Sequence, residues 1–442
     1  GGGSLVYANT LPVPTSKFFQ SKSWSGLADW EAELKPFYTT ALTMLGATTN
    51  PKLQVGDLAL KQLGAEIGKT DSFIPAEVAV YFGQPEVTEA DPYFAGDGLE
   101  RTGCRFCGGC MTGCRHNSKN TLDKNYLYLA TQKGAVIQPE SEVFDVEPLP
   151  ACNGGGYRVK WQDPTGFFFQ RHGEVTTKGV IFSGGVLGTI KLLLELQKTS
   201  LSKLSSKLGS GIRTNSESLT FSTSLQPNPD FAKGVAIGSI LETDQNSHLE
   251  IVRYGAGSGF WRTSSVPLVS GSNIFIRLTK ILLDYALHPI QNLKVLFVKD
   301  WAKATHVLLF MQTLDSTLSF SKGFFGRMAT TVEKGQAPTA FMEEAFALNA
   351  KFSKLTGAKP MAFLAESIFG IPNTAHILGG AVMGENSAEG VIDKNNKVFG
   401  YEDMLICDGS MISANIGVNP SLTITALCER AMSKVPAKIS TN

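Results

Sequence analysis

The chain of 442 residues lacks an excess of charge of either sign and lacks a long apolar run. Its 40 Lys and Arg residues balance 39 Asp and Glu residues, so the charge predicts no nucleic-acid partner and no acidic one. No stretch reaches the roughly 18 uninterrupted apolar residues of a membrane-spanning helix. Charged residues make up 18% of the chain and hydrophobic residues 43%. This balance excludes a disordered or fibrous protein, and the length predicts about two or three domains.

The N-terminus lacks both a methionine and a signal peptide. The chain opens on Gly1, Gly2, Gly3 and Ser4, without a charged or apolar leader. Taken alone, this stretch is as typical of an expression linker as of a native loop. An even spread of cysteines is missing too, since four of the seven lie between residues 104 and 114. This clustering favours a reducing, cytoplasmic compartment or a metal site over a secreted disulfide framework.

The order of predicted elements indicates two kinds of sheet. Apolar spacing predicts helices over 26–46, which Pro36 interrupts, and over 121–132. Between residues 135 and 182, four short apolar runs predict strands, and the last leads through a Gly-rich turn at 183–188 into a helix. Strand, Gly-rich turn and helix in this order are typical of a doubly wound nucleotide-binding sheet.

The middle of the chain predicts a different architecture. Between residues 219 and 314, four runs rich in β-branched and aromatic residues predict strands, and the two runs that follow, joined by GFFG, predict a hairpin. We expect an antiparallel sheet here. Because α/β sequence lies on both sides of it, we predict an α/β fold in which a doubly wound domain is interleaved with an α+β domain.

The C-terminal stretch carries four short motifs in succession. His376 begins H-I-L-G-G, and Gly400 and Tyr401 form the second motif. Asp408 and Gly409 lie in I-C-D-G-S, and Asn419 and Pro420 lie in G-V-N-P-S-L-T-I. Asn at the N-cap and Pro at the first helical position predict a helix start, whose N-terminus would stabilise an anion. A glycine after a strand lets the backbone approach a phosphate closely. Taken singly, the histidine is more typical of a structural residue and Asn-Pro of a plain cap.

The order of these motifs resembles the glucose–methanol–choline flavin oxidoreductases, in the cholesterol oxidase branch. Residues 1–7 are similar to the family's loop past the flavin ring, 119–127 to its helix leading back into the nucleotide-binding sheet, and 183–188 to its returning turn. The resemblance extends over nearly the whole chain. It implies an FAD-binding domain made of 1–12, 119–215 and 376–442, and a substrate domain made of 13–118 and 216–375.

The resemblance also implies the site. In the family a hydride passes from the alcohol carbon to flavin N5, and the His and Asn that line the reacting face match His376 and Asn419. An imidazole can accept the hydroxyl proton, and an amide can orient the substrate oxygen or the flavin edge. The residues that match the family's FAD contacts are Gly2, Gly3, Ser4, Asn9, Val143, Gly184, Gly185, Asp408, Gly409, Asn419 and Pro420.

Two family features have no clear counterpart. The N-terminal strand and its G-x-G-x-x-G turn are missing, which predicts that the sequence starts about a hundred residues inside the family's fold and disfavours the linker interpretation. Cholesterol oxidases also carry a glutamate that moves a steroid double bond. The corresponding region, 250–265, offers only Glu250 and aligns poorly. Isomerase activity is therefore not predicted.

Four cysteines carry the strongest metal-binding pattern. Cys104, Cys107, Cys110 and Cys114 have the C-x2-C-x2-C-x3-C spacing of a bacterial ferredoxin, with Arg115 where Pro is usual. The spacing leaves open an iron–sulfur cluster, a zinc site and a metal-free loop.

The segment 265–300 mixes apolar residues at helical spacing with several Lys and Arg residues. This pattern is typical of a helix that lies in a membrane interface and equally of a helix packed on the protein's own core. We expect an FAD-dependent oxidoreductase that acts on a sterol or similar apolar alcohol, with oxygen or a redox carrier as acceptor, located in the cytoplasm or peripheral to a membrane. The alternatives are a dehydrogenase that passes electrons through an iron–sulfur site and a non-catalytic membrane- or metal-binding module.

Overall fold

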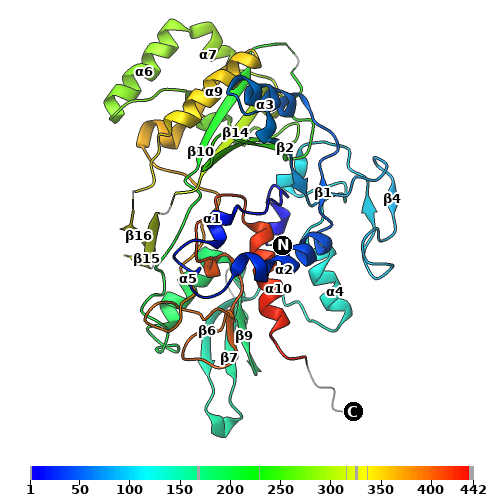
Figure 1. Cartoon of the computed structure of the whole chain (residues 1–442), viewed down its shortest axis with the longest axis vertical. Helices are drawn as coiled ribbons and strands as arrows, with labels where there is room; N and C mark the ends of the chain where they lie inside the picture. Colours follow the sequence, from blue (N-terminus) through cyan, green and yellow to red (C-terminus); the bar gives the residue numbers. More distant parts are fainter. Residues whose placement is uncertain are drawn as a thin grey trace.

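The computed structural model describes residues 2–166, 170–227, 229–314, 316–323, 327–335 and 337–437. The molecule is elongated, with a helix-covered antiparallel sheet at one end and several smaller sheets at the other (Figure 1). The N-terminal segment lies near the middle, next to the C-terminal helix (Figure 1). The fold is α/β with mixed sheets.

The large sheet has seven strands, all antiparallel to their neighbours. In spatial order they are β13 (Ser265–Pro267), β17 (Ala358–Phe363), β10 (Ser218–Ser224), β14 (Thr305–Gln312), β12 (Ser247–Val252), β11 (Ile237–Glu242) and β2 (Phe73–Pro75). The antiparallel sheet predicted for the middle of the chain is therefore confirmed, and strands from residues 73–75 and 358–363 join it.

The two faces of this sheet have different partners. Helices α3 (Val55–Glu66) and α9 (Glu343–Leu355) pack on one face, against Leu249 and Ile251 of β12. The opposite face carries Leu309 and Met311 of β14 and packs on the loop around Cys104. Because side chains alternate along a strand, His248 and Glu250 of β12 belong to this second face. Polar groups thus lie within an apolar surface.

The other end of the molecule contains smaller sheets. A meander of β6 (Glu142–Pro148), β7 (Tyr157–Gln162) and β8 (His172–Thr177) lies beside the parallel pair β9 (Val180–Phe182) and β18 (Met404–Ile406). Helix α5 (Gly185–Leu196) follows β9 through the predicted Gly-rich turn. Of the doubly wound sheet that the sequence predicts, the described residues contain this one parallel pair.

Short paired strands complete the molecule. They are β1 (Thr48–Thr49) with β3 (Glu77–Val78), β4 (Thr88–Glu89) with β5 (Arg101–Thr102), and β15 (Thr317–Lys322) with β16 (Met328–Lys334). The last pair confirms the predicted hairpin, although three residues of its GFFG turn lie outside the described residues.

Two predicted helix boundaries need correction. Helix α2 (Trp30–Met44) continues through Pro36 and is not divided there. The Ala32 carbonyl that Pro36 leaves without its helical donor belongs to an exposed residue, so water can bond it. Helix α10 (Ser421–Ser433) has Pro420, not Asn419, at its N-cap position, and no side chain caps it. The other helices are α1 (Ser16–Phe19), α4 (Tyr126–Gln132), α6 (Ile274–Leu287), α7 (Pro289–Leu296) and α8 (Trp301–Ala304).

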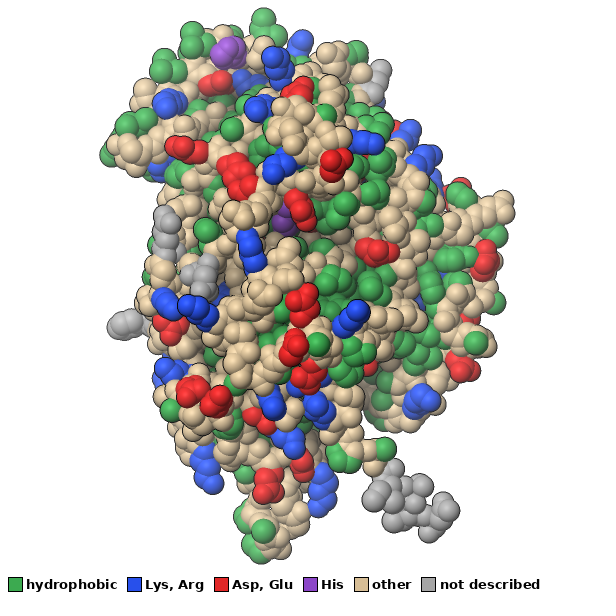
Figure 2. Space-filling view, viewed as in Figure 1, with side chains coloured by type: hydrophobic (Ala, Val, Ile, Leu, Met, Phe, Trp, Pro, Cys, Tyr) green, Lys and Arg blue, Asp and Glu red, His purple; other side chains and the backbone are tan. Residues whose placement is uncertain are grey.

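Within the described residues, every helix is too short or too polar to cross a bilayer. Helices α6 and α7 cover one end of the molecule and expose much of their apolar surface, with basic side chains nearby (Figure 2). Only part of the segment predicted to be amphipathic is therefore packed on the protein's core.

Candidate active site

His376 forms a short ion pair with a glutamate that precedes β10. Its Nδ1 lies 2.6 Å from Oε1 of Glu217. The same carboxylate accepts hydrogen bonds from the Thr374 hydroxyl at 2.8 Å and the Ala375 amide at 2.6 Å. These contacts fix the imidazole ring, and Nε2 on its opposite side has no hydrogen-bond partner among the described residues. That nitrogen is free to meet a substrate.

The electrostatics of this pair suit proton transfer. Burial alone would lower the pKa of His376, but the adjacent Glu217 carboxylate outweighs burial and raises it above its ordinary value. Burial alone would raise the pKa of Glu217, while the His376 imidazole and the donors on Thr374 and Ala375 hold it below its ordinary value. The carboxylate therefore stabilises the imidazolium that forms when His376 accepts a proton.

Asn419, Glu250 and His248 form a second set of polar contacts in the same site. Its Nδ2 donates to Oε2 of Glu250 at 3.3 Å, and Oε1 of Glu250 lies 3.5 Å from Nε2 of His248. Glu250 also lies close enough to raise the pKa of His376. Through Glu250 the structure thus brings together the two residues predicted as catalytic, although they lie 43 positions apart in the sequence.

Backbone contacts explain how these distant segments meet. Bridges pair Glu217 with Asn373 and Arg213 with Leu378, so residues 373–378 run beside the chain that enters β10. Gly417 has a positive φ, and a Cβ there would lie 2.2 Å from the Thr313 hydroxyl. The glycine of G-V-N-P therefore lets the segment before α10 approach the end of β14.

The predicted flavin loop at the N-terminus is anchored by a buried lysine. The Nζ of Lys119 donates to the carbonyl oxygens of Leu5 at 3.0 Å, Tyr7 at 2.7 Å and Cys110 at 3.0 Å. Burial lowers the pKa of Lys119 to about 8. Ser4 accepts a hydrogen bond from the Leu122 amide, while Gly2 and Gly3 are exposed. The loop is therefore held in place while its glycines stay accessible.

Asn9 and Asn419 carry buried polar atoms that have no hydrogen bond among the described residues. Asn9 is fully buried with a positive φ of 56°, and neither its Oδ1 nor its Nδ2 has a partner among the described residues. The Oδ1 of Asn419 is likewise unpaired. Gly185 has open space where a side chain would lie. Since unpaired buried amides are costly, these groups fit a polar cofactor such as FAD.

Asp408 connects the two turns of the parallel sheet pair. Its Oδ2 accepts hydrogen bonds from the Gly185 amide at 3.0 Å and the Thr189 hydroxyl at 2.5 Å. A Cβ at Gly409 would lie 3.1 Å from a methyl group of Val186. Packing and hydrogen bonding within the protein therefore account for both residues of the D-G motif. Val143 lies on β6, partly buried, and Gly184 precedes α5.

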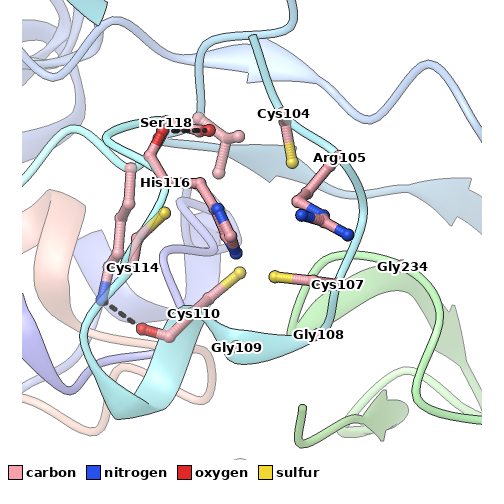
Figure 3. A pocket seen from close by; sticks show the side chains of 12 residues that line it. Cys104, Arg105, Cys107, Gly108, Gly109, Cys110, Cys114, His116, Ser118 and Gly234 are labelled. Carbon is pink, nitrogen blue, oxygen red and sulfur yellow. Dashed lines mark hydrogen bonds between the residues drawn. The ribbon is translucent and has the colours of Figure 1, made fainter. Parts of the chain in front are cut away.

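The four clustered cysteines line one small pocket together with His116 and Lys119 (Figure 3). Burial raises the pKa of Cys104 to about 11 and that of Cys110 to about 12, so both thiols are neutral at neutral pH and do not repel. A Cβ at Gly108 would lie 2.2 Å from the Ala232 carbonyl oxygen, so packing requires this spacer.

This geometry gives the predicted metal site no support. No group of three or more His, Cys, Asp or Glu side chains in the part of the chain that the structure describes is arranged to hold a metal ion. That statement covers the predicted ligands Cys104, Cys107, Cys110 and Cys114.

Comparisons with known proteins identify the family to which the chain belongs. The chain is 38% identical to a cholesterol oxidase of Acinetobacter baumannii over 99% of this chain and 81% of the relative. It is also 38% identical to a cholesterol oxidase of Mycobacterium tuberculosis over 100% and 78%. A family model described as GMC oxidoreductase matches residues 309–428. The chain belongs to the GMC oxidoreductase family.

This GMC oxidoreductase is an FAD-dependent alcohol oxidoreductase by its family. Its fold is similar to a crystal structure of pyridoxine 4-oxidase from Mesorbium loti, with a TM-score of 0.59 and 13% identity over 98% of this chain and 83% of that one. An FAD-dependent oxidoreductase from Chaetomium thermophilum gives a TM-score of 0.52 at 14% identity, covering 98% and 84%. At these identities the likeness concerns the fold alone.

Two polar residues of this site in the GMC oxidoreductase, Glu217 and His248, belong to no motif that the sequence predicts. A third, Glu250, lies in a region that aligns poorly with the family. A weak signal exists for the last two, since a His and a Glu two residues apart in an apolar strand lie on one face. Glu217 follows no periodic pattern, because it precedes its strand.

Proposed function

We propose that this GMC oxidoreductase binds FAD and oxidises the secondary alcohol of a sterol or similar apolar molecule by hydride transfer to flavin N5. The observation that carries the proposal is the convergence of His376 and Asn419, each bonded to its own buried carboxylate. A buried carboxylate is costly unless it is used for structure or chemistry. Here both carboxylates support groups that can contact one alcohol.

The proposed roles follow from the hydrogen bonds. Glu217 holds the imidazole through Nδ1, so Nε2 of His376 faces the substrate and accepts the hydroxyl proton. Glu250 holds the Nδ2 of Asn419, so its Oδ1 is available to the substrate hydroxyl. FAD, when bound, supplies the hydride acceptor. The protein orients the alcohol, takes its proton and keeps the resulting charge paired.

The residues proposed to hold FAD are those that the family resemblance selects. They are Gly2, Gly3, Ser4, Asn9, Val143, Gly184, Gly185, Asp408, Gly409, Asn419 and Pro420. The unpaired amide of Asn9 and the open backbone at Gly185 support this set. We keep as a proposal the division into an FAD domain (1–12, 119–215, 376–442) and a substrate domain (13–118, 216–375).

An apolar substrate suits the sheet face around Glu250. Phe221, Leu309, Met311 and Met361 belong to the buried cluster on this face. A rigid apolar molecule would be recognised there through buried surface, and its single hydroxyl through His376. The two relatives from Acinetobacter baumannii and Mycobacterium tuberculosis are cholesterol oxidases, which supports a sterol as substrate and oxygen as acceptor.

Two alternatives have less support. A dehydrogenase that feeds a cluster at the four cysteines finds no metal-binding geometry among the described residues. A non-catalytic module would not account for His376 and Asn419, each of which is hydrogen-bonded to its own buried glutamate. A second activity has one observation in its favour, because Glu250 is buried beside Asn419 in the region that corresponds to the family's double-bond-moving glutamate. Conversion of a 5-ene-3-one steroid to its conjugated isomer, lost in Glu250→Gln, tests it.

A membrane surface is the proposed partner. Helices α6 and α7 expose large apolar side chains, and the exposed charged side chains of 274–299 are the lysines Lys280, Lys294 and Lys299. The most exposed apolar residues are Phe275, Leu282, Leu287, Ile290 and Phe297. Such a surface fits anionic lipid, in which an apolar alcohol would dissolve.

The proposed function is tested with the holoenzyme under anaerobic conditions. Cholesterol in detergent micelles should bleach the oxidised flavin absorbance in a single turnover, and oxygen should then restore it. A holoenzyme whose flavin is not reduced by cholesterol but is reduced by a short polar alcohol would overturn the proposal that the substrate is apolar. A protein that binds no FAD would overturn the proposal as a whole.

A further inference from the structure

We propose that His248 is a positioning residue that, through Glu250, fixes the amide of Asn419 for alcohol oxidation. The inference rests on the proposed function and extends it to a residue outside the predicted site. His248 does not contact Asn419 directly. The relay runs from its Nε2 to Oε1 of Glu250 at 3.5 Å, and from Oε2 of Glu250 to Nδ2 of Asn419 at 3.3 Å.

The position of His248 follows from strand geometry. Residues two apart on a strand point to the same face, so His248 stands beside Glu250 on β12. β12 is held between β11 and β14, which leaves its backbone little freedom. The side chains of His248 and Glu250 are only 8% and 0% exposed. A modest rotation of either would bring the 3.5 Å separation into hydrogen-bond range.

Glu250 needs this second contact. Its carboxylate is fully buried, and Arg253, the nearest cation in sequence, forms its ion pair with Asp57 instead. Asn419 supplies one neutral donor to Oε2, while Oε1 has no hydrogen bond among the described residues. Leaving a buried carboxylate oxygen without a donor is costly. His248 Nε2 is also without a hydrogen bond, and each group is the natural partner of the other.

The orientation of Asn419 is what this relay controls. An amide can be turned by half a rotation, which exchanges its donor and its acceptor. While Oε2 of Glu250 is held in place as the acceptor, Nδ2 of Asn419 faces it and Oδ1 faces the site. If Glu250 swings away, this preference is lost and the amide can present NH2 to the substrate hydroxyl instead. A misplaced orienting group lowers the rate of chemistry more than it lowers binding.

The experiment compares His248→Phe with His248→Gln in the holoenzyme. Phenylalanine keeps the volume and removes both ring nitrogens, while the glutamine amide can place a nitrogen near the position of Nε2. We expect the limiting rate of anaerobic flavin reduction by cholesterol to fall about tenfold in His248→Phe, with the apparent affinity for cholesterol within about twofold. His248→Gln should recover most of the rate. The matched control is His288→Phe, whose side chain is 48% exposed between α6 and α7.

Three results would overturn the inference. One is a His248→Phe enzyme that reduces its flavin as fast as wild type. Another is a His248→Gln enzyme as slow as His248→Phe, which would indicate a packing role only. The third is an equal loss in the His288→Phe control. Far-ultraviolet circular dichroism and FAD content show whether each variant folds. If His248→Phe does not fold, the rates of flavin reduction in His248→Gln and Glu250→Gln are compared instead. A His248→Gln enzyme as slow as Glu250→Gln would overturn the inference, and a clearly faster one would support it. Failure of wild-type flavin reduction would overturn the proposed function itself.

Discussion

The site contains two buried imidazole–carboxylate pairs of opposite character. In the His376–Glu217 pair the two atoms lie 2.6 Å apart, and the carboxylate accepts further hydrogen bonds from Thr374 and Ala375. In the His248–Glu250 pair the separation is 3.5 Å, and both facing atoms lack a hydrogen bond among the described residues. The first pair is complete without a ligand, whereas the second is not.

This difference separates two tasks. A complete pair holds its ring in one orientation and can stabilise a new positive charge at once, which suits the residue that accepts a proton. An incomplete pair retains freedom to adjust, which suits a support that tightens when substrate and cofactor arrive. The position of each glutamate relative to its strand explains this difference in hydrogen bonding. Glu217 precedes its strand and meets a loop amide, whereas Glu250 lies within a strand whose amides are already paired.

The largest effect is expected where the two pairs meet the substrate. His376→Ala and Asn419→Ala should each slow flavin reduction by cholesterol by about 10²-fold or more, since each removes a group that we propose to contact the reacting alcohol. Rapid-mixing absorbance measures the rate, and circular dichroism should show both variants folded. Rates within a few-fold of wild type in both would place the active site elsewhere and remove the basis of the comparison.

A smaller effect is expected from breaking the complete pair. Glu217→Gln keeps the shape and removes the charge that raises the pKa of His376, so the pKa should fall. If neutral His376 accepts the proton, the rate of flavin reduction rises with pH through this pKa, and its acid limb should move to lower pH in the variant. We expect a loss of about tenfold at neutral pH, shrinking as the pH falls.

The same variant tests the stability of the pair. The lowered pKa of Glu217 contributes stability that is present above its ordinary value of 4.5 and is lost as the pH falls, while the raised pKa of His376 contributes stability that is lost as the pH rises through it. Glu217→Gln should therefore lose most stability between about pH 5 and 7, measured by chemical denaturation. An acid limb and a stability curve unchanged from wild type would contradict the pairing.

Much of the fold could be predicted from the sequence, and less of the site. Local periodicity was sufficient for the antiparallel strands and for the Gly-rich turn before α5. The order of motifs selected His376 and Asn419, because such motifs are contiguous. Their partners could not be selected, since Glu217 and Glu250 meet them only through pairings of segments more than 150 residues apart. The metal site at the four cysteines stays a prediction without support, and packing against Ala232, distant in sequence, accounts for the glycine at 108.

A third buried carboxyl has no imidazole beside it and shows how burial alone affects a glutamate of this protein. Glu366, in the π-helix Ala365–Phe369, accepts hydrogen bonds only from the Ser218 hydroxyl, the Leu219 amide and, at 3.5 Å, Asn373 among the described residues. Burial raises its pKa to about 7 from an ordinary 4.5. Between these values the folded protein keeps a proton that the unfolded chain releases, so stability falls as the pH rises.

Glu366→Gln should flatten this dependence. Wild type should lose up to about 3 kcal/mol of unfolding free energy between pH 4.5 and 7 through this group, and the variant should not. Urea denaturation across this pH range measures the difference, with Glu343→Gln, an exposed carboxyl at the start of α9, as the control. A parallel pH dependence in wild type and Glu366→Gln would show that this carboxyl is ionised in the folded protein.

The smallest effect on chemistry is expected far from both pairs, on the exposed helices. Phe275→Ser and Phe297→Ser should weaken co-sedimentation with vesicles of anionic lipid, because the two side chains are 77% and 78% exposed and their burial in the interface stabilises binding. Ile281 is a poor choice for this purpose, since it is buried and its loss would destabilise the helix packing. Val136→Ser, at a site 90% exposed that follows α4, is the control. Flavin reduction by cholesterol in detergent should stay within about twofold of wild type in all three variants, because neither histidine pair is touched.

Equal vesicle binding by wild type and both phenylalanine variants would assign the apolar face to another contact, and a slowed detergent reaction would mean that these helices support the pairs directly.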